Sequence, residues 1–236
     1  MRRIGILGGS FNPAHGGHRR ISLRAASALG LDEVWWLVSP GNPLKPVEGM
    51  APLPMRVASA RAQARRAPIR VSAIEREFGT RYTRDTLVRL RRRYPRDRFI
   101  WLMGADNLAQ FQHWHRWRDI ARCLPIAVIA RPGYNSHALA APAMAWLGRF
   151  RRPVASLTHL ADRGRADWSA PALVLLAFDP DPRSASAIRQ ADPDWASRFQ
   201  SEPGQGVVSL RDGLTHRLIT SQPYSRGRAA ARNNRP

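Results

Sequence analysis

The chain is poor in cysteine, lysine and long apolar runs, and these shortages limit the classes of protein to which it can belong. Its only cysteine, Cys123, cannot form an internal disulfide, and its place in a helical pattern favours a buried structural residue over a nucleophile. No run reaches the roughly 18 apolar residues of a membrane-spanning helix. The N-terminal segment lacks the apolar core of a secretory signal. These absences predict a cytoplasmic protein with no membrane partner.

Lys45 is the only lysine among 38 cationic residues, which give a formal charge of +21. So large a positive charge is typical of proteins that bind nucleic acid. The arginines are spread along the whole chain, however, which favours a compositional bias, so nucleic acid is not the expected partner. The single lysine is therefore a candidate functional residue, because a compact ammonium differs in geometry from the guanidinium that the chain uses elsewhere.

Apolar runs alternate with helical patterns over most of the 236 residues, a length that allows one sizeable core. Strands that are apolar throughout and alternate with helices predict a parallel sheet covered on both faces, a doubly wound, Rossmann-like α/β fold. The patterns predict strands at 3–7, 33–38, 69–73, 98–103, 125–130 and 172–178, and helices at 19–29, 55–66, 83–93, 106–111, 117–123, 137–150 and 184–190.

The apolar periodicity fades after about residue 199. We expect one main domain over 1–200 and a C-terminal packed element over 201–222. Residues 223–236 are expected to form a disordered basic tail. The apolar residues available to the packed element are Val207, Val208, Leu210, Leu218 and Ile219.

A glycine-rich turn over residues 9–18 joins the first predicted strand to the first predicted helix. Gly8 and Gly9 carry no Cβ, so a ligand could approach the backbone closely. His15 and His18 share one side if the helix begins near residue 14 or 15. A helix start favours phosphate, and ligands of doubly wound sheets bind at the carboxyl ends of strands. The turn is therefore the expected phosphate site; the alternative is a turn with two solvated histidines.

The turn resembles the Gly-x-Phe-x-Pro-x-His-x-Gly-His motif of nucleotidyltransferases that share the class I aminoacyl-tRNA synthetase type of Rossmann domain. Further segments, in order over about residues 1–190, are similar to bacterial nicotinate mononucleotide adenylyltransferases. They are Arg81-Tyr82-Thr83-Arg84-Asp85-Thr86-Leu87, Gly104-Ala105-Asp106-Asn107-Leu108 followed by Phe111, Trp114 and Trp117, Ala130-Arg131-Pro132-Gly133, and Ser184-Ala185-Ser186-Ala187-Ile188-Arg189. The resemblance implies an enzyme of NAD biosynthesis that transfers the adenylyl group of ATP to nicotinate mononucleotide and releases pyrophosphate.

The resemblance also implies roles for individual residues. His15, His18 and Arg189 are the expected catalytic residues, with Arg189 on the β- and γ-phosphates. Asp106 is expected to bind a ribose hydroxyl, to cap the helix after it, or both, and Ser184 to cap the last helix. The expected ATP-binding residues are Gly8, Gly9, Ser10, Phe11, His15, His18, Gly104, Asp106, Ser184, Ser186, Ile188 and Arg189.

The expected mononucleotide site draws on other segments. Trp114 either stacks on the pyridine ring or belongs to the core, and the helix start at 82–86 offers amides to the nicotinate carboxylate. The full set is Asn12, Lys45, Tyr82, Thr83, Asp85, Thr86 and Trp114. The chain departs from the family pattern at Asn12 (often Asp), Leu44 (His), Ala185 (Ser) and Ser186 (Thr).

The implied reaction needs no nucleophile from the protein, because the attacking group is an anionic phosphate oxygen. In-line attack without a covalent enzyme intermediate is expected, with Mg²⁺ carried by the ATP phosphates and no metal ligands from the protein. Two alternatives remain. One is a sibling adenylyltransferase acting on nicotinamide mononucleotide or phosphopantetheine; the other is a non-catalytic basic protein that binds nucleotide or RNA. The sequence does not indicate an oligomeric state.

Overall fold

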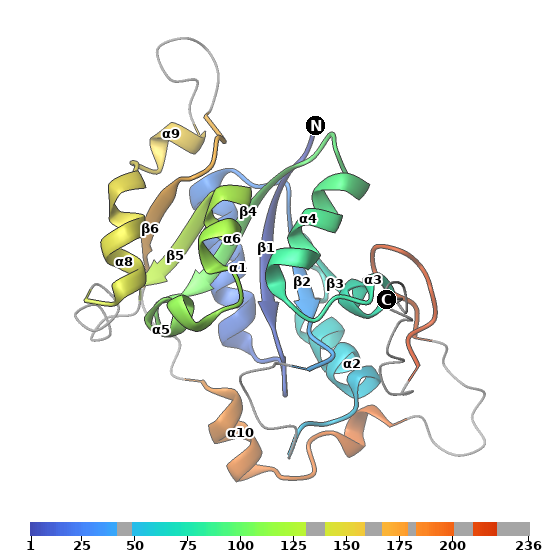
Figure 1. Cartoon of the computed structure of the whole chain (residues 1–236). Helices are drawn as coiled ribbons and strands as arrows, with labels where there is room; N and C mark the ends of the chain where they lie inside the picture. The colour runs from blue at the N-terminus through green and yellow to red at the C-terminus, as the bar shows by residue number, and fades with distance from the viewer. Residues whose placement is uncertain (42–48, 131–139, 159–166, 179–182, 201–209, 221–236) are drawn as a thin grey trace, which may run out of the picture.

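A computed structural model describes residues 1–41, 49–130, 140–158, 167–178, 183–200 and 210–220 (Figure 1). Its centre is a six-stranded sheet in the order β3-β2-β1-β4-β5-β6, and every neighbouring pair is parallel. The predicted doubly wound parallel sheet is confirmed. The strands are β1 (Arg3–Gly9), β2 (Glu33–Val38), β3 (Ile69–Ser72), β4 (Arg98–Gly104), β5 (Ile126–Ala130) and β6 (Leu173–Ala177).

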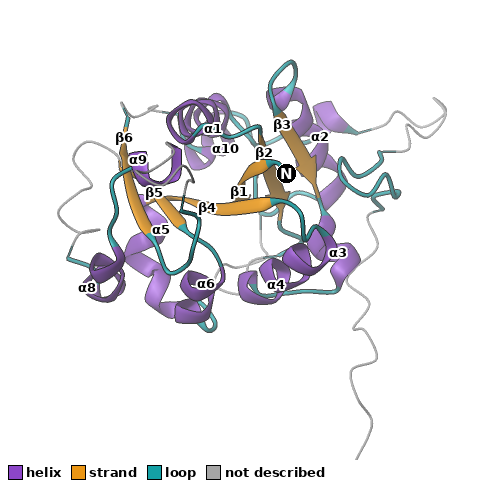
Figure 2. Cartoon of the chain, turned by 90° about the horizontal axis from the view of Figure 1, so that it is seen from above, coloured by secondary structure: helices purple, strands orange, loops and turns teal. Residues whose placement is uncertain are grey.

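Helices cover both faces of the sheet, with α1 and α2 on one side and α4, α6 and α8 on the other (Figure 2). The described α-helices are α1 (Gly16–Leu29), α2 (Leu53–Ala64), α3 (Ile74–Phe78), α4 (Thr83–Arg93), α5 (Ala105–Gln110), α6 (Trp117–Cys123), α8 (Pro142–Leu147), α9 (Ala155–Thr158) and α10 (Ala185–Ala191). Short 3-10 segments follow at Phe111–His113, Gly148–Phe150 and Ser197–Phe199. None of the described helices has the length and apolar character needed to span a bilayer.

The apolar character of the strands follows from this two-sided burial. In β2, Val34, Trp36 and Val38 pack into the core beneath α1 and α2, whereas Trp35 and Leu37 pack into the opposite core. Successive side chains of a strand point to opposite faces, so a strand covered on both sides needs apolar residues throughout.

The seven predicted helices are present with shifted bounds; the one predicted at 137–150 is observed as α8 and the 3-10 segment after it, and the short α9 was not predicted. α1 begins three residues before the predicted start, because His15 caps it, and it ends at Gly30 in the left-handed region (φ 58°). α3 was not predicted; it is a five-residue helix that ends at Gly79 (φ 63°). Of the helix predicted at 137–150, residues 137–139 lie outside the described chain. Cys123 is helical as predicted, but it is half-buried rather than buried.

Residues 210–220 pack against the end of edge strand β3. The buried Asp212 carboxylate accepts hydrogen bonds from the Ser72 hydroxyl (2.8 and 2.9 Å) and from the backbone N–H of Ala73 (2.6 Å) and Leu214 (2.8 Å). Leu210 and Ile219 pack against the core, whereas Leu218 is exposed. Val207, Val208 and the predicted tail at 223–236 lie outside the described residues.

Candidate active site

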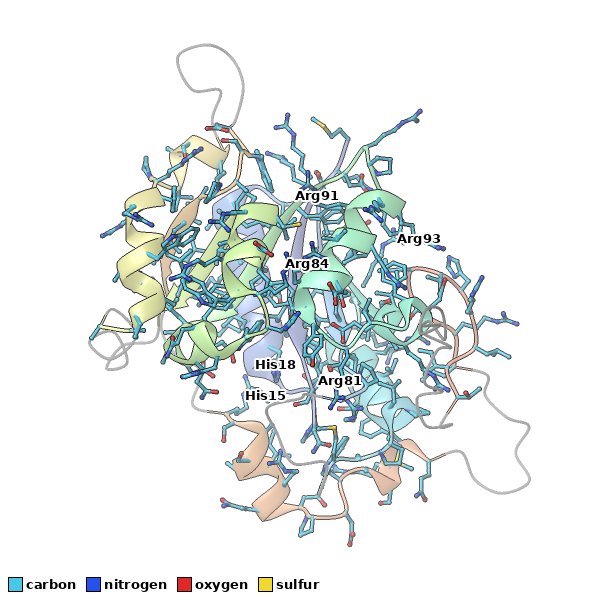
Figure 3. All side chains as sticks on the ribbon, in the orientation of Figure 1. His15, His18, Arg81, Arg84, Arg91 and Arg93 are labelled. Atoms are coloured by element: carbon cyan, nitrogen blue, oxygen red, sulfur yellow. The ribbon has the colours of Figure 1, made fainter. Side chains whose placement is uncertain are left out.

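The β1–α1 turn lies at the carboxyl edge of the sheet, where the winding reverses. β1 pairs with β2 on one side and with β4 on the other, so the turns that leave β1 and β4 are neighbours at this edge. Figure 3 shows His15 and His18 together at the amino end of α1. The sequence therefore places its unusual turn at the edge where open α/β sheets bind ligands.

His15 and His18 form a reciprocal cap at the start of α1. The Nδ1 of His15 accepts a hydrogen bond from the Gly17 N–H (3.1 Å), and the Nδ1 of His18 accepts one from the His15 N–H (3.2 Å). The two ring centroids are 3.9 Å apart. Because both Nδ1 atoms are acceptors, the proton of each neutral ring is on Nε2. The prediction that both histidines lie on one side of the helix start is confirmed, and these bonds fix the orientations of the two rings.

Packing explains two other residues of the turn. A Cβ on Gly8 would lie 2.5 Å from the Trp101 ring, so Gly8 lacks a side chain because Trp101 fills the space. The Trp101 ring accounts for the glycine at this position, and the expectation that Gly8 also lets a ligand approach stays a prediction. Phe11 is buried at a positive φ of 47° and stacks on Trp36, with ring centroids 5.0 Å apart; it also contacts the His18 ring. The aromatic stack supports the second histidine from behind.

The start of α10 reaches the same turn from the far end of the chain. Arg189 donates a hydrogen bond to the Asn12 carbonyl (2.6 Å) and another to the Ser186 hydroxyl (3.4 Å). Ser184 caps α10 as predicted, its hydroxyl accepting from the Ala187 N–H (3.1 Å). Arg189 is thus anchored three residues before His15, and Ile188 beside it is half-buried. The three expected catalytic residues converge on one turn.

The β4–α5 turn supplies Gly104 and Asp106. Gly104 occupies the N-cap position of α5 without a side-chain cap, so the prediction that Asp106 caps this helix is wrong. Asp106 lies inside the first turn and is exposed. Its carboxylate folds back over Gly104, where an added Cβ would lie 2.4 Å from Oδ1. The other expected role of Asp106, binding a ribose hydroxyl, stays a prediction.

Asn12 holds the chain that follows β2. Its amide nitrogen donates to the Gly49 carbonyl (2.9 Å), and its amide oxygen accepts from the Ala51 N–H (3.1 Å). An aspartate could not donate the first of these bonds, which gives the departure from the family pattern a structural reason. Lys45 and Leu44, in the same connection, lie outside the described residues, as do 131–133.

The start of α4 combines an open edge with a buried hydrogen-bond network. Tyr82 is exposed and stacks on His115, with ring centroids 4.3 Å apart, and Thr83 and Asp85 are half-buried. The Thr86 hydroxyl is buried and within hydrogen-bond distance of Thr80 Oγ1 (2.8 Å) and Glu75 Oε1 (3.3 Å). Thr86 therefore has a role inside the fold.

Glu75 lies beneath the start of α4. Burial raises the pKa of this carboxyl to about 7, and hydrogen bonds from Thr86 and Ser39 oppose the shift. The residue was missed in the sequence, because one carboxylate among alternating charges gives no signal of its own.

Trp114 lies after the short 3-10 segment that follows α5. Its ring meets Phe111 and Trp101 edge-on, with centroid distances of 5.4 and 6.1 Å. The side chain is only half-buried and packs at the margin of the core. This position is compatible with both predicted roles, because a ring supported at its edge can still present a face.

Arg56, on α2, is a second residue that the sequence did not reveal. The side chain is 1 % exposed and donates to the carbonyls of Ser10 (2.7 Å), Ser39 (2.7 Å), Ala51 (2.8 Å) and Pro40 (3.4 Å). Among the described residues it has no carboxylate partner, and burial lowers its pKa to about 10. It ties the carboxyl ends of β1 and β2 to α2, so it sits directly behind the site.

The described residues contain no group of three or more His, Cys, Asp and Glu side chains placed to hold a metal ion. The donors at this edge are imidazole N–H, guanidinium and backbone N–H groups, which suit anions.

Comparisons with known proteins agree with this geometry. The model of the cytidylyltransferase-like family matches residues 6–191. The chain belongs to this family. A protein from Erythrobacter litoralis is 64 % identical over 217 residues, which cover 92 % of this chain and 94 % of the relative. One from Bradyrhizobium is 50 % identical over 195 residues, 83 % of this chain and 99 % of its own. Both carry the name probable nicotinate-nucleotide adenylyltransferase.

Solved structures extend the likeness to the fold of the family. Plasmodium falciparum nicotinic acid mononucleotide adenylyltransferase complexed with NaAD matches with a TM-score of 0.58 at 15 % identity. The match covers 80 % of this chain and 83 % of that one. The same protein complexed with APC gives a TM-score of 0.56 over the same shares. At this identity the likeness concerns the fold.

Proposed function

We propose that the protein transfers the adenylyl group of ATP to nicotinate mononucleotide, giving deamido-NAD and pyrophosphate. The observation that carries this proposal is the convergence of His15, His18 and Arg189 on the turn at the sheet's switch point. The family membership and the names of relatives at 64 % and 50 % identity support the same substrates.

The geometry suits a reaction between two anions. An oxygen of the mononucleotide phosphate attacks the α-phosphorus of ATP, the new O–P bond forms in line with the breaking bond to the bridging oxygen, and pyrophosphate leaves with that electron pair. The Nε2–H groups of His15 and His18 donate to the triphosphate, His18 nearest the α-phosphorus. Arg189 neutralises charge on the outer phosphates. The protein holds the reactants and stabilises charge.

Magnesium belongs to the substrate in this proposal. Mg²⁺ carried by the ATP phosphates would offset the charge that develops on the leaving pyrophosphate. Asp106 binds a ribose hydroxyl, and Trp114 with the α4 start receives the nicotinate. A cytoplasmic location remains a prediction from the sequence.

Pyrophosphate release tests the proposal. The purified protein is given MgATP with nicotinate mononucleotide, nicotinamide mononucleotide or phosphopantetheine in parallel. We expect turnover to be fastest with nicotinate mononucleotide. Faster turnover with either other acceptor would assign a sibling activity, and no release with any of them would favour a binding protein. The matched control is His18→Ala, which lacks the donor nearest the α-phosphorus and whose folding is checked by circular dichroism.

A further inference from the structure

Glu75, on α3, links two segments that border the candidate site. α3 packs against both β2 and α4 (Figure 1). The Glu75 Oε1 accepts a hydrogen bond from the Thr86 hydroxyl near the start of α4 (3.3 Å), and the same carboxyl hydrogen-bonds with the Ser39 hydroxyl just after β2. The Ser39 N–H donates to the Gly9 carbonyl (2.9 Å), where the turn that carries the histidines begins. One carboxyl therefore joins the expected acceptor side of the site to the expected ATP side.

The Ser39 hydroxyl shows which protonation state of Glu75 suits this arrangement. Its oxygen lies 2.8 Å from the Gly41 carbonyl, which can only accept, so the single hydroxyl proton lies between these two oxygens. The Ser39 oxygen must then accept from Glu75, and a carboxyl donates only when it is protonated. The neutral form of Glu75 therefore lets Ser39 bond to both of its neighbours at once.

Ionisation of Glu75 would redirect two hydroxyl groups. A carboxylate only accepts, and hydrogen bonds to it are stronger than those to a neutral carbonyl. The Ser39 proton would turn toward the carboxylate and leave the Gly41 carbonyl. Thr86 Oγ1 lies 3.3 Å from both Glu75 Oε1 and the Tyr82 carbonyl, and its proton would turn away from Tyr82. Because Tyr82 is the N-cap residue of α4, the ionised form weakens backbone contacts on both sides of the site.

Charged and titratable side chains on the surrounding elements are engaged with other groups. They are Arg76 (with Thr220) and Glu77 (with Arg93 and Arg217) on α3, Arg84 with Asp85 on α4, Arg56 with the carbonyls after β2, Asp212 with Ser72 and Ala73 at the end of β3, and His115 with Tyr82. Burial raises the pKa of Glu75 to about 7, the bonds with Thr86 and Ser39 oppose this shift, and no charge in the described chain is among its causes. The carboxyl therefore changes state near neutral pH because of its own immediate contacts.

We propose that protonated Glu75 is a positioning residue for nicotinate mononucleotide, holding the start of α4 and the chain after β2 at the spacing that the acceptor needs. The inference rests on the proposed function for the identity of the acceptor. Glu75 acts through Thr86 and Ser39 and needs no contact with either substrate. Acceptor binding should therefore weaken as pH rises through neutrality, whereas ATP binding should show no part of this dependence on Glu75.

Calorimetric titration with nicotinate mononucleotide at about pH 7 and about pH 8.5 tests this role. Over this range the protonated fraction of Glu75 falls from about one half to about one thirtieth, so the wild-type affinity should fall about tenfold or more. Glu75→Gln should bind about equally well at both values, because its amide donates to Ser39 and accepts from Thr86 at either pH. Glu75→Ala should bind about tenfold more weakly than wild type already at the lower pH.

Two comparisons separate positioning from a general effect on the fold. Glu77→Gln is the matched control, because it removes a carboxylate from the same helix that is paired with Arg93 and Arg217 (3.6 Å each), and it should keep the wild-type pH dependence. Titration of wild type and Glu75→Gln with MgATP should give affinities within about twofold of each other at each pH.

The outcomes distinguish this inference from the proposed function. An equal pH dependence of acceptor binding in wild type and Glu75→Gln would overturn the inference, and so would a parallel loss of ATP affinity in Glu75→Ala, which would make Glu75 merely structural. The expected pH series without pyrophosphate release would refute the proposed function alone, because the titrations need no turnover. A wild-type protein that binds the mononucleotide at neither pH would overturn both.

Discussion

Replacing the buried Arg56 by methionine should destabilise the fold at the carboxyl edge of the sheet, where the candidate site lies. Its guanidinium makes three bonds of 2.7–2.8 Å to the carbonyls of Ser10, Ser39 and Ala51. Bonds from a charged donor contribute about 1.5–3 kcal/mol each, or about 5–9 kcal/mol together. Methionine keeps much of the side-chain volume but removes all three.

Burying the guanidinium charge costs free energy, and this cost opposes the stabilisation from the three hydrogen bonds. Burial lowers the pKa of Arg56 to about 10, and a shift of this size corresponds to a cost of about 3 kcal/mol for the buried charge. Subtracting this cost leaves about 2–6 kcal/mol of net stabilisation that Arg56→Met would lose. Burial of the apolar methionine side chain should regain part of this loss.

Urea unfolding followed by tryptophan fluorescence measures this loss, and the chain has eight tryptophans to report it. Arg92→Met is the matched control, because Arg92 is exposed on α4 and its loss should change the free energy of unfolding by less than about 0.5 kcal/mol. A loss below about 1 kcal/mol for Arg56→Met would refute the reasoning, since the carbonyls would then be satisfied without the guanidinium.

The other predictions concern the site itself. His18→Ala should lower kcat by about 100-fold or more while ATP affinity changes little, because the donor acts mainly in the transition state; equal losses in single-turnover rate and calorimetric affinity would contradict that role. Trp114→Ala should raise the KM for the mononucleotide and leave the KM for ATP unchanged; a rise in both would make Trp114 structural. Between pH 4.5 and 7 the folded state holds a proton on Glu75 that the unfolded state releases, so the free energy of unfolding should fall by about 3 kcal/mol as pH rises. Urea titrations across this range should show the fall in wild type and lose it in Glu75→Gln, and an unchanged slope in the variant would contradict the assignment.

Most of the fold was predictable because its strands are buried on both faces. A strand such as β2 leaves a continuous apolar run, and all six such runs were placed within about two residues. The start of α1 was placed too late, because Gly16 and Gly17 are poor helix formers and histidine is not a preferred cap. His15 and His18 form a capping box at this start, and imidazoles replace the hydroxyl and carboxylate or amide groups that usually form one, so the sequence held no familiar start signal.

The site residues that belong to a motif, Arg189 among them, were predictable, whereas Arg56 lies outside any motif and was not. In a chain that uses arginine for nearly every positive charge, the residue type carries no information about which copy is buried and which meets a ligand. Arg56 and Arg92 differ in their surroundings, because four carbonyls lie around the guanidinium of Arg56 whereas Arg92 is exposed on α4. The surroundings of Arg56 are assembled from segments up to 46 residues apart, as Ser10 and Arg56 are. The same residue type therefore anchors the backbone at one position and lies in solvent at another, because only the fold decides whether carbonyl oxygens or water face the guanidinium.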